Sequence, residues 1–162
     1  MCRMIISSRF STGEAREAGS NKHWQMHFEY NIEGGDFTRA GYASSQVKKL
    51  LKKQGVEMSV IKRTVVAAYE AEVNVVAHAY GGVMYVDLDD RQMRIVLQDT
   101  GPGIEDIQQA MEEGYSTASD AVREMGFGAG MGLSNMKKNA HELNIESEVG
   151  KGTRVEIIMQ IA

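Results

Sequence analysis

The sequence predicts an α+β domain built as a two-layer α/β sandwich, in which helices cover one face of a mixed, mostly antiparallel sheet. Several segments alternate apolar and polar residues, the pattern of a strand with one buried face. Strands joined by short polar turns must be antiparallel, which excludes a doubly wound parallel sheet. Other segments have the apolar spacing of helices, and packing them on one face of the sheet buries both sets of apolar side chains.

The composition indicates one domain. The chain has 162 residues, of which 43% are hydrophobic and 25% charged. This length and composition are enough for one hydrophobic core. Its net charge of −4 does not resemble that of a nucleic-acid-binding protein. A single cysteine, Cys2, excludes an internal disulfide and fits a reducing compartment. No run of apolar residues is long enough for a membrane span. We therefore expect a cytoplasmic protein without nucleic-acid or membrane partners.

The first residues show no sustained periodicity. Residues 1–22 mix Ser, Gly, Glu, Arg and Lys, and we expect a disordered lead-in that lies outside the fold. The domain is then expected to cover residues 23–162.

A strand and a helix open this domain. The apolar residues at Trp24, Met26 and Phe28 continue in alternation to Ile32, which predicts a strand with one buried face. A glycine pair breaks it, and Asp36 is expected to cap a helix that ends at Gly55.

The next helix is long and mostly apolar. It is expected to begin at Ser59 and to end at the glycine pair 81–82, lying against the sheet with little of its surface exposed. Glu70, Asn74 and His78 stand at positions i, i+4 and i+8, so they share one face. Three stacked polar groups on a buried face require a shared partner.

The second half of the chain is predicted to supply the other strands and a loop. Its expected elements are strands at 83–89 and 92–99, a short helix at 105–113, a mobile loop at 114–125, a helix from Leu133 to Leu143, and a closing hairpin of strands 144–149 and 153–161.

A glycine-rich stretch, Gly126 to Leu133, has glycine at alternate positions up to Gly132. Each glycine reaches positive φ at little cost, so successive N–H groups can turn toward one anion. A helix that begins directly after it adds its own unsatisfied N–H groups. This pattern predicts a phosphate-binding loop, and a flexible linker is the alternative.

The common nucleotide and metal signatures are absent. The chain has no G-x-x-x-x-G-K-[ST] and no true G-x-G-x-x-G. Asp36-Phe37 is followed by Thr38, and no H-R-D occurs, which excludes the eukaryotic-type protein kinase fold. His141-Glu142 lacks a second histidine at the spacing of a zincin, and a zinc site is not expected.

Four other residues suggest nucleotide chemistry. Asp99 ends a strand beside glycines, where its carboxylate can accept a hydrogen bond from an exocyclic amine such as that of adenine. Asn74 offers an amide oxygen of the kind that Mg²⁺ accepts. Glu70, one turn earlier, is placed to take a proton from a hydroxyl group or a water near a γ-phosphate. Thr153 could hydrogen-bond the base directly or through water.

These residues belong to motifs in a fixed order. The segments are 70–74 with His78 and Tyr80, 99–103, 128–133, and 150–153. In this order they resemble the N-box and glycine boxes of the GHKL ATPase superfamily, which has the Bergerat nucleotide-binding fold. The likeness is strongest to the small bacterial anti-sigma-factor serine/threonine-protein kinases of partner-switching systems.

The resemblance implies roles for individual residues. Glu70 would be the general base, Asn74 would bind Mg²⁺, and Asp99 would bind the adenine amine. For His78, a hydrogen bond to nearby backbone is the alternative to ligand contact. The residues that the resemblance assigns to Mg-ATP are Asn74, His78, Asp99, Gly101, Gly103, Ile104, Ser116, Thr117, Gly128, Gly130, Met131, Gly132, Leu133 and Thr153.

The resemblance also implies an activity and partners. The expected activity is transfer of the γ-phosphoryl group of Mg-ATP to a Ser or Thr of a STAS-domain anti-sigma-factor antagonist by a homodimeric kinase. A sigma factor and a phosphatase are further candidate partners. The first alternative is a nucleotide-gated binding module, in which ATP or ADP orders the loop at 114–130 and so selects a partner without obligatory catalysis. The second is a structural domain that binds no nucleotide.

Overall fold

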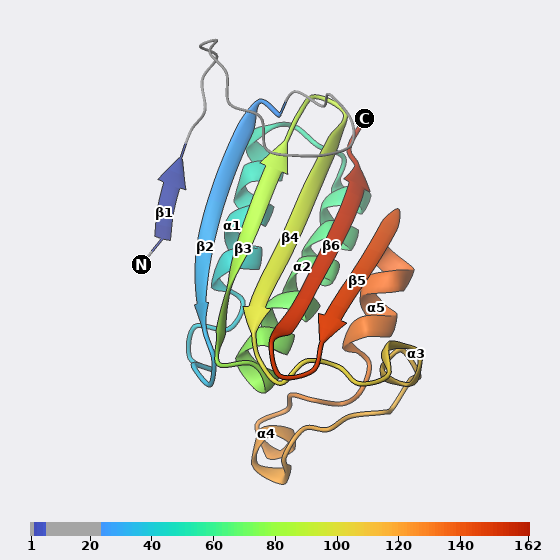
Figure 1. Ribbon diagram of the computed structural model, residues 1–162. Helices are drawn as coiled ribbons and strands as arrows, with labels where there is room; N and C mark the ends of the chain where they lie inside the picture. The colour runs from blue at the N-terminus through green and yellow to red at the C-terminus, as the bar shows by residue number, and fades with distance from the viewer. Residues whose placement is uncertain (1, 6–23) are drawn as a thin grey trace.

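The computed structural model describes residues 2–5 and 24–162 of the chain, and Figure 1 shows how its elements are arranged. In chain order the elements are β1 (Cys2–Ile5), β2 (Met26–Glu33), α1 (Tyr42–Lys53), α2 (Met58–His78), β3 (Gly81–Leu88), β4 (Gln92–Thr100), α3 (Ile107–Ala110), α4 (Asp120–Glu124), α5 (Gly132–Asn139), β5 (Glu142–Glu148) and β6 (Gly152–Gln160).

The strands form one sheet in the order β1-β2-β3-β4-β6-β5. A mixed, mostly antiparallel sheet is predicted, and every pairing between the described strands is antiparallel. The hairpin of β5 and β6 adds β6 to β4 and leaves β5 at the edge (Figure 1). This arrangement brings the start of β6 beside the end of β4, although the two are far apart in the sequence.

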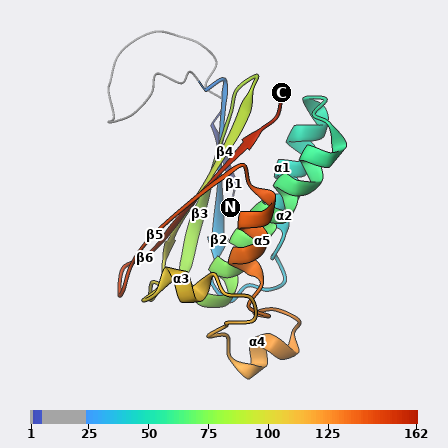
Figure 2. The same ribbon diagram turned by 90° about the vertical axis from the view of Figure 1, so that its right-hand side faces the viewer.

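The helices form a second layer, which confirms the two-layer prediction. Figure 2 shows α1, α2 and α5 on the same side of the sheet. Alternate residues of β3 face them, namely Met84, Val86 and Leu88. Helix α2 carries small residues at the contact, and Ala67 and Ala68 are fully buried. Small side chains let α2 approach the sheet and its neighbouring helices closely.

Helix α1 begins later than predicted. Asp36 does not cap it, because its carboxylate accepts a hydrogen bond from Thr38 Oγ1 at 2.6 Å and the chain turns there. The residue before the helix is instead Gly41, whose φ of 94° is available to glycine at little cost. The first N–H groups of α1 are bound by Glu72 of α2, which is 2% exposed. Its two carboxylate oxygens accept from the N–H of Ala43 at 3.0 Å and of Ser44 at 2.9 Å.

Replacing Glu72 is expected to destabilise the fold. The Glu72→Ala variant leaves two buried N–H groups of α1 without their acceptor and opens a cavity. We expect a loss of about 2–4 kcal/mol in the free energy of unfolding. Urea unfolding followed by circular dichroism measures it. Glu72→Gln keeps one acceptor oxygen and should lose less, so equal losses in the two variants would contradict this role of the carboxylate.

Other boundaries differ from the sequence-based expectations in small ways. The glycine pair 81–82 opens β3 rather than closing α2, since both residues pair with β2 and β4. Helix α3 is one turn long, and the polar loop contains the short helix α4, capped by the Ser119 side chain.

The expected lead-in is only partly described. Cys2–Ile5 pair with the outer edge of β2, which otherwise has unpaired backbone groups, and this differs from the expectation for residues 1–22. Residue 1 and residues 6–22 of the lead-in lie outside the described residues. Within the described part of the chain, no helix is both long enough and apolar enough to cross a membrane.

Candidate functional site

A cleft of about 1420 Å³ lies between the C-terminal half of α2, the ends of β4 and β6, and the segment from Pro102 to Leu133. Nearly all residues assigned to the nucleotide from the sequence line it. They are Glu70, Asn74, His78, Asp99, Gly103, Ile104, Ser116, Thr117, Gly128, Gly130, Met131, Gly132, Leu133 and Thr153. Gly101 does not line the cleft: it is buried, and an added Cβ would lie 3.0 Å from Ala79 Cβ and 3.2 Å from Asp99 Oδ1. The roles of these residues toward a nucleotide stay predictions.

Helix α2 supplies one wall. Glu70 and Asn74 are half-buried and lie next to Gly132, the first residue of α5. A Cβ at Gly132 would lie 3.2 Å from Asn74 Oδ1 and 3.3 Å from Glu70 Oε2. A larger residue would therefore fill the space in front of both oxygens. Burial lowers the pKa of His78, farther along the same face, so its imidazole is neutral at pH 7.

The opposite wall is formed where β4 meets β6. Asp99 Oδ1 accepts a hydrogen bond from the backbone N–H of Thr153 at 3.0 Å. The Thr153 hydroxyl lies 2.8 Å from Ser147 Oγ, which also accepts from the N–H of Ile104 at 2.7 Å. Gly152 is required here, because a Cβ would lie 2.1 Å from the Asp99 carbonyl oxygen. The contacts hold Asp99 in place through one carboxylate oxygen.

The glycine-rich segment folds back on the loop before it. The N–H of Gly114 donates to the carbonyl of Gly130 at 3.0 Å, which closes the base of the lid, residues 114–130. Gly128 has a φ of 72°, and a Cβ there would lie 2.3 Å from Ala118 Cβ. Arg123 donates to the Ser116 carbonyl at 3.1 Å. These glycines therefore allow the lid to pack against itself at the mouth of the cleft.

Two contacts of this region are absent from the sequence-based assignment. Phe127 of the lid packs on Phe37, in the segment before α1, with ring centroids 5.0 Å apart. Asn135 of α5 donates from Nδ2 to Glu70 Oε1 at 2.9 Å. Its position in the first turn of the helix after the glycine-rich stretch is the signal that could have identified Asn135.

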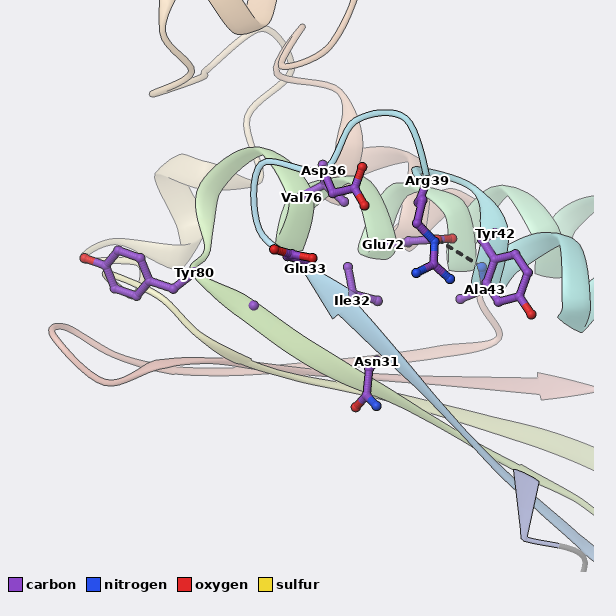
Figure 3. Close-up of a pocket in the computed structure, with 11 residues that line it drawn as sticks. Asn31, Ile32, Glu33, Asp36, Arg39, Tyr42, Ala43, Glu72, Val76 and Tyr80 are labelled. Atoms are coloured by element: carbon purple, nitrogen blue, oxygen red, sulfur yellow. Dashed lines mark hydrogen bonds between the residues drawn. The ribbon is translucent and has the colours of Figure 1, made fainter. Parts of the chain in front are cut away.

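A second cavity lies away from these residues (Figure 3). It has a volume of about 280 Å³ and lies between the end of β2, the segment before α1, and α2. Its buried carboxylate, Glu72, is bound to the start of α1, as the dashed line to Ala43 shows. Since pockets for small-molecule ligands measure roughly 300–1,000 Å³, the larger of these two cavities is the one with room for a nucleotide.

The motif spacing and this geometry agree with a comparison to known families. The histidine kinase-like ATPase domain matches residues 36–159, most of the chain. The chain belongs to this family. The match begins within the segment before α1 and ends in β6, so it includes every residue that lines the larger cleft.

Curated relatives carry the names of two kinds of protein. An anti-sigma F factor of Pasteuria penetrans is 34% identical over 146 residues, which cover 85% of this chain and 89% of the relative. An anti-sigma F factor of Clostridium acetobutylicum is 37% identical over 94 residues, which cover 55% of this chain and 62% of the relative. The serine/threonine-protein kinase RsbT of Bacillus subtilis is 35% identical over 72 residues, 44% of this chain and 48% of the relative. The chain thus aligns with less than two thirds of the last two.

A solved structure supports the fold. The crystal structure of the RsbU and RsbW domains of a Mycobacterium tuberculosis protein superposes with a TM-score of 0.55. The match covers 82% of this chain and 32% of that chain at 19% identity. It confirms the predicted α+β architecture of the chain.

Proposed function

We propose that the protein is a Mg-ATP-dependent serine/threonine-protein kinase and anti-sigma regulatory factor, which phosphorylates a STAS-domain antagonist in the cytoplasm. The observation that supports this most is the convergence of Glu70, Asn74 and Asp99 on one cleft beside a glycine-rich loop. The names of the relatives, anti-sigma F factor and RsbT kinase, favour the partner-switching class. A homodimer, with a sigma factor or a phosphatase as further partners, is part of the proposal.

The cleft fits Mg-ATP in size and in donor set. Asp99 has one oxygen bound to Thr153 and a second that is available to an adenine amine. The open space in front of Gly132, next to Asn74 Oδ1, suits a metal-bound phosphate, and the first N–H groups of α5 lie at its edge. Asn74 would hold Mg²⁺, which supplies charge neutralisation of the phosphates.

The residues of the chain then have separate tasks. Glu70 Oε2 would take the proton of the substrate hydroxyl, since Oε1 is already bound by Asn135. The backbone N–H groups of the glycine-rich loop and of α5 would stabilise negative charge that develops on the phosphoryl oxygens. The lid would exclude water from the cleft, which suppresses hydrolysis in favour of transfer.

A transfer assay tests the activity. The protein is mixed with labelled Mg-ATP and a STAS-domain protein encoded beside it, and label on Ser or Thr of that protein is measured. We expect stoichiometric transfer that depends on Mg²⁺. The proposal fails if nucleotide binds and no label reaches the STAS-domain protein.

Nucleotide binding is also expected to depend on pH. Burial raises the pKa of Asp99 above its usual range, although the N–H of Thr153 acts in the opposite direction. The ionised form is the acceptor for the adenine amine, so affinity should fall as the pH drops through this raised value. Calorimetry on wild type and Asp99→Asn at each pH separates this loss from titration of the phosphates. Parallel pH profiles in the two proteins would refute the assignment.

The same raised pKa has a consequence for stability. The folded state binds the Asp99 proton more tightly than the unfolded state does. The contribution of this group to the free energy of unfolding is therefore largest at low pH and is lost as the pH rises through its folded pKa. An ionised Asp99 at neutral pH costs the fold some stability, as is common for a binding residue.

One observation favours the nucleotide-gated module as a second candidate. The contact of Phe127 with Phe37 joins the lid to the segment before α1, outside the cleft. A nucleotide that moves the lid would therefore also act on the surface around Arg39 and Tyr42. Replacement of Glu70 separates the two functions. The kinase should lose label transfer, whereas the module should keep its ATP-dependent capture of a partner.

A further inference from the structure

We propose that Asn135 is a positioning residue for phosphoryl transfer. It holds one oxygen of Glu70 and leaves the other facing the cleft, so that the base is aimed only when the glycine-rich loop and α5 are in place. This inference rests on the proposed function and adds a residue that neither the motifs nor the assigned roles include.

The contact itself is specific. Asn135 Nδ2 lies 2.9 Å from Glu70 Oε1, and both side chains are half-buried. A glutamate has several free torsions, and its terminal torsion is broad, so packing along α2 alone does not fix its carboxylate plane. One amide donor on Oε1 removes this freedom. The second oxygen, Oε2, is the one that lies 3.3 Å from the position of a Cβ at Gly132.

Asn135 is itself held firmly. Its backbone N–H donates to the Met131 carbonyl at 2.8 Å, and its own carbonyl accepts from Asn139 Nδ2 at 2.8 Å. The next residue, Met136, is fully buried in the core and fixes the rotation of α5 about its axis. Because the backbone of Asn135 is anchored on both sides, its side chain can act as a rigid support for Glu70.

The same helix is joined to the lid. Lys138 forms an ion pair with Glu113, the residue directly before the lid, and the lid closes at its base through Gly114 and Gly130. Gly130 is separated from Gly132, the first residue of α5, by Met131 alone. Phosphate bound by the glycine-rich loop would therefore fix the start of α5, and with it Asn135. The arrangement links occupancy of the phosphate site to the direction of the base.

The experiment compares Asn135→Ala and Asn135→Asp with wild type in the transfer assay. Asp has the shape of Asn and preserves packing, but it cannot donate to a carboxylate. We expect kcat to fall about 10- to 100-fold in both variants, the size of a misplaced catalytic group. The KM for ATP should stay within about twofold, since Asn135 does not contact the nucleotide. Lys137→Ala, an exposed position on the same helix, is the matched control and should retain wild-type kcat.

A second background tests whether Asn135 acts through Glu70. In Glu70→Asp the carboxylate is shorter and withdraws from Asn135, while some activity is retained. Adding Asn135→Ala to this variant should lower kcat by less than about twofold, because the shared interaction is already lost. A full additional loss in this background, unchanged kcat in Asn135→Asp, or a rise in KM alone would each overturn the inference.

The proposed function and this inference fail in different ways. If wild type transfers no phosphoryl group, the kinase assignment is wrong. If wild type transfers it and Glu70→Gln does not, but Asn135→Ala and Asn135→Asp keep wild-type kcat, the kinase assignment stands and the role of Asn135 is refuted.

Discussion

The Glu70→Gln variant is expected to lose about 10²- to 10⁴-fold in the rate of phosphoryl transfer, the range for removal of a general base. Gln has the size of Glu and can still accept from Asn135 Nδ2 through its amide oxygen. It cannot take a proton from the substrate hydroxyl. The fold should therefore be kept, and only the chemical step should be lost.

The measurement separates binding from chemistry. Calorimetry with a non-hydrolysable ATP analogue should give an affinity within about twofold of wild type, because an interaction made only in the transition state leaves ground-state binding unchanged. Single-turnover transfer to the STAS-domain protein then reports the chemical step. Transfer at the wild-type rate in Glu70→Gln would exclude Glu70 as the base.

A neighbouring carboxylate provides the comparison. Glu70 and Glu72 are two positions apart on α2, and residues at this spacing point to nearly opposite sides of a helix. Glu70 faces the cleft, whereas Glu72 is buried against the start of α1. Glu70→Gln should thus affect catalysis with little change in stability, and Glu72→Ala should affect stability first.

These two residues also show what the sequence can predict. The sequence identifies Glu70 because Asn74 follows it by one helical turn, a relation that the geometry of α2 fixes locally. The partners of Glu72 are N–H groups of another helix, 28 and 29 positions away, and no local sequence pattern predicts these contacts. The contact of Asn135 with Glu70 joins residues 65 positions apart, so no local pattern predicts it either.

The same distinction applies to the fold. The strands and α2 were predicted within a few residues, since their periods of apolar residues are long and regular. The sequence predicts the start of α1 five residues too early, because Asp36 is a residue type that often caps helices and only the structure shows its bond to Thr38. Helix α4 spans five residues, which is too short for any period to be recognised.

The Asp99→Asn variant is expected to have the largest effect on nucleotide binding. Asn can still accept from the Thr153 N–H through its amide oxygen, so the junction of β4 and β6 should be preserved. Its NH₂ group then replaces the oxygen that is available to an adenine amine. Two hydrogen-bond donors, this NH₂ group and the adenine amine, would then face each other. Loss of a hydrogen bond to a charged acceptor, about 2–3 kcal/mol, corresponds to a roughly 30- to 150-fold loss in ATP affinity.

The choice of nucleotide provides a test that a general loss of affinity cannot imitate. Inosine triphosphate has a carbonyl where ATP has the exocyclic amine, so it offers Asp99 no donor at that position. Wild type should bind ATP much more tightly than inosine triphosphate, whereas in Asp99→Asn the preference should disappear or reverse, because the new NH₂ group can donate to that carbonyl. Thermal unfolding without nucleotide serves as the control and should show no loss, since the uncharged Asn avoids the burial penalty that raises the pKa of Asp99. If Asp99→Asn kept its preference for ATP, the adenine would have to be recognised elsewhere in the cleft, with Thr153 as the next residue to replace.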